Sequence, residues 1–230
     1  GGKKLSSRDG TELTLAALLA EARAAVGRAS AASAATAVSS AGDGESDALA
    51  HAAIRYYDLT HARRSTYALS FDRMTSLRGN TAAYAAYATT RLAALRGAIL
   101  HLDQSQRTVG TAASWSACYR AVTGEVDAGS HAPVGDEGLD RFSDAAERKL
   151  ALQVLRMPEA WEHATATQQP NVVAEAVFDV ATAFHAFYAS CRIIGAPRHT
   201  AARRVVLCWA TDIALQTGLH LLGCGLVTRM

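Results

Sequence analysis

The chain has 230 residues and half of them are hydrophobic, which is enough for one large domain or for one domain plus an appendage. Alanine dominates the hydrophobic residues and valine and isoleucine are sparse, so the composition predicts an all-α protein and argues against a large sheet. The net charge of +2 is too mild to establish nucleic-acid binding, which requires a local cluster of basic side chains.

The N-terminal part of the chain is predicted to hold one helix between two irregular segments. Residues 1–11 are polar and bounded by glycines, which indicates a loop. Thr11 or Thr14 is placed to cap a helix with apolar residues at helical spacing, namely Leu15, Leu18, Leu19 and Val26. A weakly packing serine and alanine stretch follows at 29–41, and 39–46 is typical of a turn. Residues 12–45 are therefore predicted to be a connecting helix and linker.

Two more helices are predicted before residue 102, with an extended segment between them. The first runs from about 46 to 57, and alternating apolar and polar residues at 65–72 indicate the extended segment. Asn80 and Thr81 are then placed to cap a helix at about 81–101. Its face carries residues at steps of three and four, namely Tyr84, Tyr87, Arg91 and Leu95.

The least helical part of the chain is 103–138. It contains one short predicted helix at 114–122 and an exposed loop at 126–138. A segment of this length without regular structure is unusual inside a compact domain, so we interpret it as an insertion.

Three helices are predicted in the last part of the chain. The first, 139–157, is expected to end where Met157 meets Pro158. The second runs from Asn171 to about Cys191. Its apolar stripe is Val173, Val177, Val180, Phe184 and Phe187, with Phe178, His185 and Tyr188 on the flank. The third, about 200–222, is apolar almost all round, which predicts burial on every side.

No motif for catalysis or metal binding is present. The sequence has no HExxH, P-loop or nucleophile-elbow pattern, so an unaided enzyme is not expected. No run reaches the length of a membrane span without a charge, so no membrane partner is expected either. The cysteines lack CxxC spacing and lie in apolar helical stretches, which predicts no metal, buried free thiols and an intracellular, reducing compartment. They are Cys118, Cys191, Cys208 and Cys224.

Four stretches, in order, resemble the C-terminal half of arginyl-tRNA synthetase, a class I enzyme. They are GKKLSSRDG (2–10), IRYYDLTHARRSTYALSFDRM (54–74), GNTAAYAAYATTR (79–91) and LLGCGLVTRM (221–230). Each stretch alone is weakly specific, but their succession covers nearly the whole chain.

The resemblance implies a helical bundle of the class I synthetase anticodon-binding type, named for a DALR sequence. It assigns this domain to 46–230, with an inserted loop near 103–138, and implies arginine tRNA or another structured RNA as partner. Residues 1–11 resemble the signature loop of the family, in which cationic and hydroxyl groups contact ATP phosphates. Those groups here are Lys3, Lys4, Ser6, Ser7 and Arg8.

The family's catalytic nucleotide-binding domain would precede Gly1. Without it, the resemblance implies that this chain alone is inactive and that ATP is a cofactor only if a catalytic domain is joined to it.

The resemblance also assigns RNA contacts. Tyr188 matches a family aromatic residue at the anticodon, and Met230 matches a terminal methionine that also approaches it. Arg192 stands where some relatives have a second aromatic residue, and arginine can also stack or bind phosphate. Tyr84 is expected to pack in the core. The predicted RNA-contacting residues are Asn80, Tyr87, Arg91, Tyr188, Arg192 and Met230.

Two functions follow from these features. The first is the anticodon-binding part of an arginyl-tRNA synthetase, as a fragment or beside a separate catalytic subunit. The alternative is a synthetase-derived, non-catalytic structural subunit of a large assembly such as a mitochondrial ribosome. The retained signature loop favours the first, whereas the absent catalytic half, the long 103–138 segment and Thr228 in the tail favour the second. The compartment would be mitochondrial or cytoplasmic. An unrelated helical bundle would require all four stretches to coincide.

Overall fold

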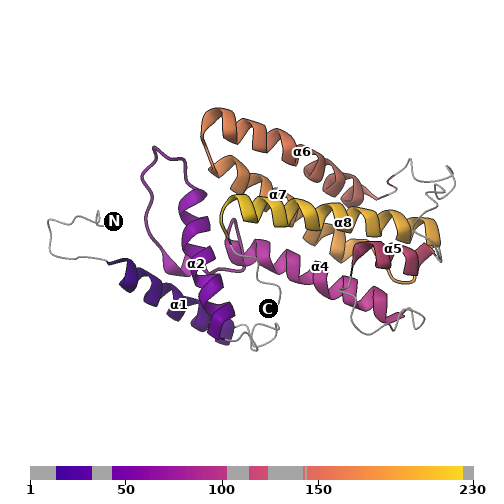
Figure 1. Ribbon diagram of the computed structural model, residues 1–230, viewed down its shortest axis with the longest axis horizontal. Coiled ribbons are helices and arrows are strands. Elements are labelled where there is room, and N and C mark those ends of the chain that lie inside the picture. The colour runs from indigo at the N-terminus through magenta and orange to yellow at the C-terminus, as the bar shows by residue number, and fades with distance from the viewer. Residues whose placement is uncertain (1–13, 33–42, 103–113, 124–141, 143, 225–230) are drawn as a thin grey trace.

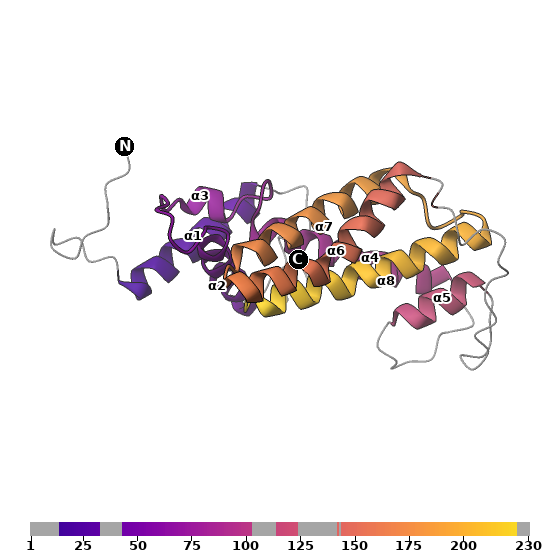
Figure 2. The same cartoon turned by 90° about the horizontal axis from the view of Figure 1, so that it is seen from above.

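The computed structural model describes residues 14–32, 43–102, 114–123, 142 and 144–224. Every regular element in these ranges is a helix, so the all-α prediction is confirmed. The helices are α1 (Leu15–Ala32), α2 (Asp43–Leu59), α3 (Phe71–Met74), α4 (Ala82–Leu102), α5 (Trp115–Thr123), α6 (Ala145–Thr167), α7 (Asn171–Ser190) and α8 (Arg198–Leu221). The long helices α4, α6, α7 and α8 form a bundle, with α1, α2 and α3 at one end and α5 at the other (Figure 1, Figure 2).

The helices of the N-terminal part begin close to their predicted caps. The Thr14 hydroxyl accepts a hydrogen bond from the backbone N–H of Ala17 at 3.2 Å, which caps α1. Helix α2 begins at Asp43, inside the predicted turn at 39–46. A single glycine such as Gly44 costs a helix only about 1 kcal/mol, which is not enough to stop it.

The predicted extended segment at 65–72 is non-helical only as far as Ser70. The Ser70 side chain caps α3 by accepting from the N–H of Arg73, so Phe71 begins a short helix. Helix α4 then begins after Thr81, as predicted, because the Thr81 hydroxyl oxygen accepts from the N–H of Tyr84 at 3.1 Å.

Helix α6 contradicts two predictions. It begins at Ala145 rather than 139, because the Asp144 side chain caps it by accepting from the N–H of Ala146 at 2.7 Å. It also continues through Pro158 to Thr167. An internal proline costs a helix about 3 kcal/mol. Met157 and the rest of the apolar face of α6 are buried against α7 and α8. Each large side chain buried in this way stabilises the fold by about 1.5–3 kcal/mol, which offsets the cost of the proline.

Helix α7 agrees with its prediction in both length and stripe. It runs from Asn171 to Ser190, and all five stripe residues are buried. Among the described residues it is the one helix long and apolar enough to cross a membrane by length and composition. It carries Glu175 and Asp179, and its stripe packs against α4, α6 and α8, which is the pattern of a core helix.

Helix α8 is not buried all round, contrary to its prediction. Val205, Leu207 and Leu215 are buried, but Val206 and Ile213 are exposed. The exposed residues Val206, Trp209 and Ile213 follow one another at steps of three and four, so they form a single stripe along α8 that no other described element covers.

The main core lies among α4, α6, α7 and α8, and a smaller cluster joins α1, α2 and α4. A close approach of three helices depends on Gly218 of α8. A Cβ there would lie 2.4 Å from Cγ2 of Val177 and 3.2 Å from Cε of Met157. The guanidinium of Arg55 in α2 donates to the carbonyl oxygen of Gly223, which fixes the end of α8 to the N-terminal helices.

Candidate nucleic-acid interface

Aromatic and cationic side chains from α4 and α7 meet on the surface of the bundle. Tyr84, Tyr87 and Arg91 project from α4, and His185 and Tyr188 project from α7; we call these five residues the aromatic–arginine cluster. The two helices contact each other directly although their sequences are about 90 residues apart.

Arg91 lies at the centre of the cluster. Its Cζ atom is 4.4 Å from the ring centroid of Tyr87 and 5.0 Å from that of Tyr188. Its guanidinium also donates a hydrogen bond to the hydroxyl of Tyr87 at 2.7 Å. Tyr87 can do both because it is four residues before Arg91, on the same helix face. Tyr188 is 40% exposed, so the cluster presents an aromatic surface with a fixed positive charge beside it.

The inner side of the cluster packs against the core. The ring of Tyr84 lies 5.5 Å from that of Phe178 and 4.8 Å from that of His185, so Tyr84 packs as expected. His185 also contacts Tyr87, with ring centroids 5.5 Å apart. Burial and the positive charge of Arg91 both lower the pKa of His185, which favours the neutral imidazole at neutral pH.

Asn80 does not join the cluster. It precedes α4, and its side-chain oxygen accepts a hydrogen bond at 2.8 Å from the hydroxyl of Tyr56, a completely buried residue of α2. The same hydroxyl lies 2.9 Å from the carbonyl oxygen of Ala174 in α7. Burial raises the pKa of Tyr56, which keeps this donor protonated. Asn80 therefore helps to fix α2, α4 and α7 relative to one another.

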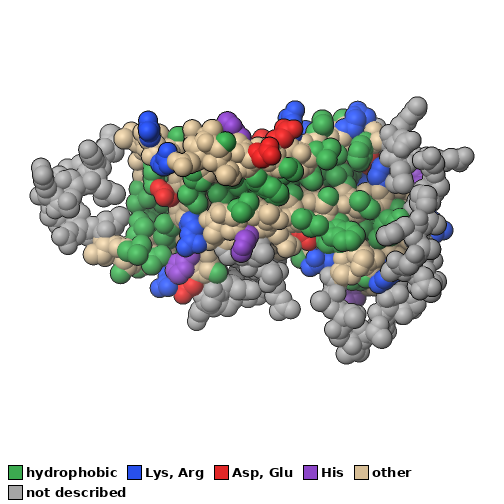
Figure 3. Space-filling view, turned by 45° about the horizontal axis from the view of Figure 1, so that its top comes forward, with side chains coloured by type: hydrophobic (Ala, Val, Ile, Leu, Met, Phe, Trp, Pro, Cys, Tyr) green, Lys and Arg blue, Asp and Glu red, His purple; other side chains and the backbone are tan. Residues whose placement is uncertain are grey.

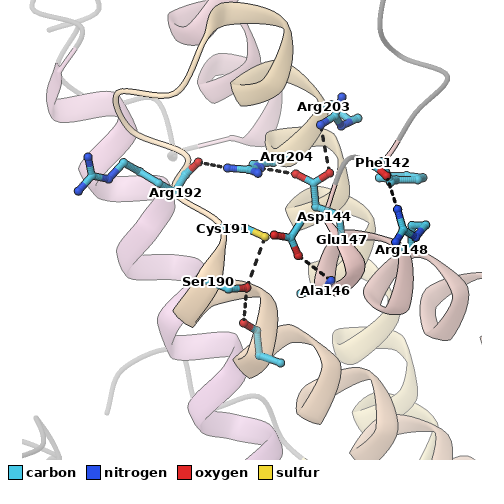
Figure 4. A network of polar contacts seen from close by, with 11 residues as sticks. Phe142, Asp144, Ala146, Glu147, Arg148, Ser190, Cys191, Arg192, Arg203 and Arg204 are labelled. Atoms are coloured by element: carbon cyan, nitrogen blue, oxygen red, sulfur yellow. Dashed lines mark hydrogen bonds and ion pairs between the residues drawn. The ribbon is translucent and has the colours of Figure 1, made fainter.

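Arg192 lies just past the C-terminal end of α7, four residues from Tyr188, and is exposed. Its backbone oxygen accepts a hydrogen bond from Arg204, while its side chain points away from Arg204 and Glu147 (Figure 4). The carboxylate of Glu147 also accepts from Arg203 at 3.1 Å and from Arg204. This network fixes the backbone from which Arg192 projects, and leaves its guanidinium at the surface.

A pocket of about 380 Å³ lies at the same end of the bundle as Arg192. Its lining comes from α4, α5, the α7–α8 connection and the start of α8, and includes Ile99, Val122, Ile193, Ile194 and Arg198. Apolar walls with a single arginine provide a surface for a flat, partly polar group such as an unstacked base.

The remaining predicted site residues lie outside the described part of the chain. These are Lys3, Lys4, Ser6, Ser7, Arg8 and Met230, and their assigned roles stay predictions, as does the exposed loop at 126–138.

The sequence-based prediction missed His185 as a member of the site. The sequence places His185 on the flank of α7, and the one signal for a site residue is its spacing of three residues from Tyr188, which puts both on one face of the helix. The contacts of His185 with Tyr84 and Tyr87 depend on how α4 and α7 align, and this alignment cannot be predicted from the sequence of either helix alone.

The cysteines are buried and free, as predicted. Burial raises the pKa of Cys118 and of Cys224 to about 11, so both thiols are protonated at neutral pH. Across the described ranges, no group of three or more His, Cys, Asp or Glu side chains could hold a metal ion.

Comparison with known proteins gives a consistent set of matches. Residues 120–230 match the family described as the DALR anticodon binding domain. The chain is 31% identical to the chloroplastic/mitochondrial arginine–tRNA ligase of Arabidopsis thaliana over 182 residues, which cover 79% of this chain and 24% of the relative. It is 30% identical to the cytoplasmic ligase of the same plant, over 77% of this chain and 25% of the relative. The arginine–tRNA ligase of Thermosynechococcus vestitus is 30% identical over 100% of this chain and 35% of the relative.

Solved structures agree on the fold. Arginyl-tRNA synthetase from Thermus thermophilus superposes with a TM-score of 0.68 at 21% identity, over 95% of this chain and 32% of the other. The enzyme from Plasmodium falciparum gives a TM-score of 0.65 at 21% identity, over 95% and 34%. The chain thus spans about a quarter to a third of the length of the relatives that it matches.

Proposed function

We propose that this chain, which resembles the C-terminal half of arginyl-tRNA synthetases and contains their anticodon-binding domain, binds the anticodon loop of arginine tRNA. The observation that carries the proposal is the position of Arg91, held between the rings of Tyr87 and Tyr188 at the surface of α4 and α7.

The chemistry of the cluster suits an unpaired anticodon base. Stacking of a base on an exposed aromatic ring contributes about 1–3 kcal/mol, and the exposed ring of Tyr188 offers such a surface. Arg91 supplies a positive charge for a neighbouring phosphate or adds a second stacking plane. Its position is fixed before RNA binds, which lowers the entropy cost of forming the contact.

Further groups at the same end of the bundle would extend the interface. Arg192 is exposed just past α7, and the pocket lined by Ile193 and Arg198 could accept a base that has left the stack. A local basic and aromatic surface of this kind binds RNA even though the net charge of the chain is only +2.

The chain covers 24% of one arginine–tRNA ligase that it matches and 35% of another. We propose that the anticodon-binding part acts together with a catalytic nucleotide-binding part, on the same chain or on a separate subunit, in an intracellular, reducing compartment. Relatives carry names that place them in chloroplasts or mitochondria in one case and in the cytoplasm in another, so either location fits.

Fluorescence anisotropy with arginine tRNA transcripts would test the proposal. The chain should bind the transcript with its natural anticodon more tightly than a transcript with a substituted anticodon. Tyr188→Ala should weaken binding by about 5- to 150-fold, which corresponds to about 1–3 kcal/mol. Tyr67→Ala is the matched control, since Tyr67 is 41% exposed but lies between α2 and α3. Equal binding of both transcripts, or no binding, would refute the proposal.

The alternative function predicts a different outcome. A structural subunit of a large protein–RNA assembly would co-sediment with that particle in a gradient and would bind transcripts without regard to the anticodon. Sedimentation of the endogenous protein with a particle, combined with anticodon-independent binding, would favour the alternative.

A further inference from the structure

The connection between α7 and α8 is tied to the bundle by a side chain of α8. Residues 191–197 form this connection, and the guanidinium of Arg204 donates a hydrogen bond to the backbone oxygen of Arg192. Within the described part of the chain, this is the one side-chain hydrogen bond to the backbone of 192–196. The N–H of Ala196 donates to the carbonyl oxygen of Ile193 at 3.2 Å, but that bond closes a turn inside the connection itself. Arg204 therefore links the backbone of Arg192 to the bundle.

The same guanidinium is held on its other side by a buried carboxylate. Its Nε donates to Glu147 in the first turn of α6, and Glu147 also accepts from Arg203 at 3.1 Å (Figure 4). Nε and Nη1 of an arginine point in different directions from one rigid plane, so a single side chain can join two acceptors. A lysine ammonium lacks this second fixed donor. Arg204 thereby joins α6, α8 and the α7–α8 connection.

Arg204 itself is poorly placed to bind RNA. Its side chain is only 12% exposed, and its charge is paired with that of Glu147. The side chain of Arg192 is exposed and points away from this network (Figure 4). The arginines of α8 all lie in its first two turns, at Arg198, Arg203 and Arg204, whereas hydrophobic side chains gather along the outer side of α6 and α8 (Figure 3). The arginines of α8 are therefore confined to the end beside Arg192.

We propose that Arg204 is a positioning residue for RNA binding, which holds the backbone from which Arg192 reaches the RNA. This role rests on the proposed function, because it concerns the same interface. Arg192 follows Tyr188 by four residues, so the direction of the chain after α7 decides how its guanidinium lies relative to that ring. Ile193 and Ile194 of the same connection line the pocket of about 380 Å³. A connection that is ordered before RNA binds lowers the entropy cost of forming these contacts.

RNA binding by a variant of Arg204 tests the proposal. Arg204→Lys keeps a positive charge beside Glu147 but loses the second fixed donor. It should weaken binding of the arginine tRNA transcript by about 3- to 10-fold, which is the cost of ordering one or two loose groups. Arg203→Lys is the matched control, since Arg203 donates to the other oxygen of the same carboxylate, and it should bind the transcript as wild type does. Equal affinity of the two variants would overturn the proposal.

A double-variant cycle tests whether Arg204 acts through Arg192. In the Arg192→Ala background, Arg204→Lys should cause a smaller loss of RNA affinity than in wild type, because the positioned group is absent. Arg192→Ala should also lower the slope of log binding constant against log salt concentration by about 0.7–1. Arg204→Gln should weaken binding without changing that slope. The same loss in both backgrounds, or a lower slope for Arg204→Gln, would show that Arg204 does not act by positioning Arg192.

Two further measurements separate this role from the proposed function and from a loss of fold. If the wild-type chain does not distinguish the natural anticodon from a substituted one, the proposed function itself fails. If it does, and the Arg204 variants bind as wild type does, only the role of Arg204 fails. Circular dichroism should show that both Arg204 variants are folded, because Arg203 still pairs with Glu147 in each. Amide hydrogen exchange at 192–196 should be faster in Arg204→Lys than in wild type, and unchanged exchange would show that Arg204 does not fix this backbone.

Discussion

The surface formed by α4 and α7 and the junction of α6 with α8 use arginine in opposite ways. On the α4–α7 surface, Arg91 is held by the neutral rings of Tyr87 and Tyr188. At the α6–α8 junction, Arg203 and Arg204 both contact Glu147, whose side chain is completely buried. A cation held by aromatic rings keeps its attraction for an anion, whereas a cation bound to a buried carboxylate does not.

The difference indicates which basic residues matter for ligand binding. A count of arginines along the sequence cannot separate these two groups, because both occur in helices and both have several neighbours. The partner decides: a carboxylate makes the arginine part of the fold, and a tyrosine makes it a fixed positive charge at the surface. Variants that remove the carboxylate should therefore change the stability of the fold, and variants that remove the ring-held arginine should change RNA binding.

The largest effect is expected for Glu147→Gln. Removal of one partner from a buried ion pair leaves uncompensated charge and typically costs about 3–5 kcal/mol. Both Arg203 and Arg204 lose their carboxylate in this variant. Denaturant unfolding followed by circular dichroism measures the change in the free energy of unfolding. Glu159→Gln on the exposed face of α6 is the control, and we expect a change below about 0.5 kcal/mol for it. Equal effects of the two variants would show that the junction is not stabilised by its ion pairs.

A smaller loss of stability is expected for Asp212→Asn. The Asp212 carboxylate accepts hydrogen bonds from Trp115 at 2.7 Å, from Arg96 at 3.3 Å and from Gln216 at 2.7 Å. The guanidinium carbon of Arg96 also lies 5.7 Å from the Trp115 ring, so this arginine combines both arrangements. The amide keeps the shape of the side chain but loses the charge, and we expect a cost of about 1–3 kcal/mol.

The fluorescence of Trp115 would report whether the loss is local, once variants of Trp161 and Trp209 have removed the other tryptophans. Additional loss on changing Arg96→Ala in the Asp212→Asn background would show that the ring of Trp115 alone holds the arginine. No additional loss would show that Arg96 depends on the carboxylate.

RNA affinity rather than stability should change for Arg91→Ala. Loss of one phosphate contact lowers the slope of log binding constant against log salt concentration by about 0.7–1. Arg91→Lys keeps the charge but not the planar group, so it should restore the salt slope more fully than the affinity. Binding titrations at several salt concentrations measure both quantities. Arg64→Ala, an exposed arginine between α2 and α3, is the control. A large loss of stability with an unchanged salt slope would place Arg91 with the structural arginines.

The sequence contained most of the fold but only half of the site. The stripe from Val173 to Phe187 predicted the buried face of α7 because helical periodicity is a local property. The end of α6 was predicted wrongly, because the cost of Pro158 is local whereas the packing of Met157 depends on α7 and α8. Burial of α8 was overestimated for a related reason. The apolar side chains of Val206 and Ile213 do not reveal whether any other element covers them.

The site divides in the same way. The spacing of Tyr87 and Arg91 predicted that they share a face of α4, and the structure places them in contact. The contact between Arg91 and the ring of Tyr188 could not be predicted in this way. It depends on how α4 lies against α7, which is a property of the folded bundle. Asn80 was predicted to contact RNA together with these residues, but its side chain accepts a hydrogen bond from Tyr56 of α2.

The smallest effect is expected for the pH dependence contributed by His185. Its pKa in the folded chain lies below the ordinary value of 6.5, owing to burial and to the positive charge of Arg91. The unfolded chain therefore binds a proton more readily. Stability from neutral His185 is fully present above about pH 6.5 and is lost as the pH falls toward the lower folded pKa.

In His185→Gln this part of the pH dependence should disappear. In Arg91→Ala it should become weaker, because the cation that opposes protonation is gone. Unfolding free energies of the three proteins between pH 5 and pH 8 measure both differences. If the unfolding free energy of all three proteins changes with pH in the same way, the charge of Arg91 does not affect the protonation of His185. Groups other than the tyrosine rings would then neutralise that charge.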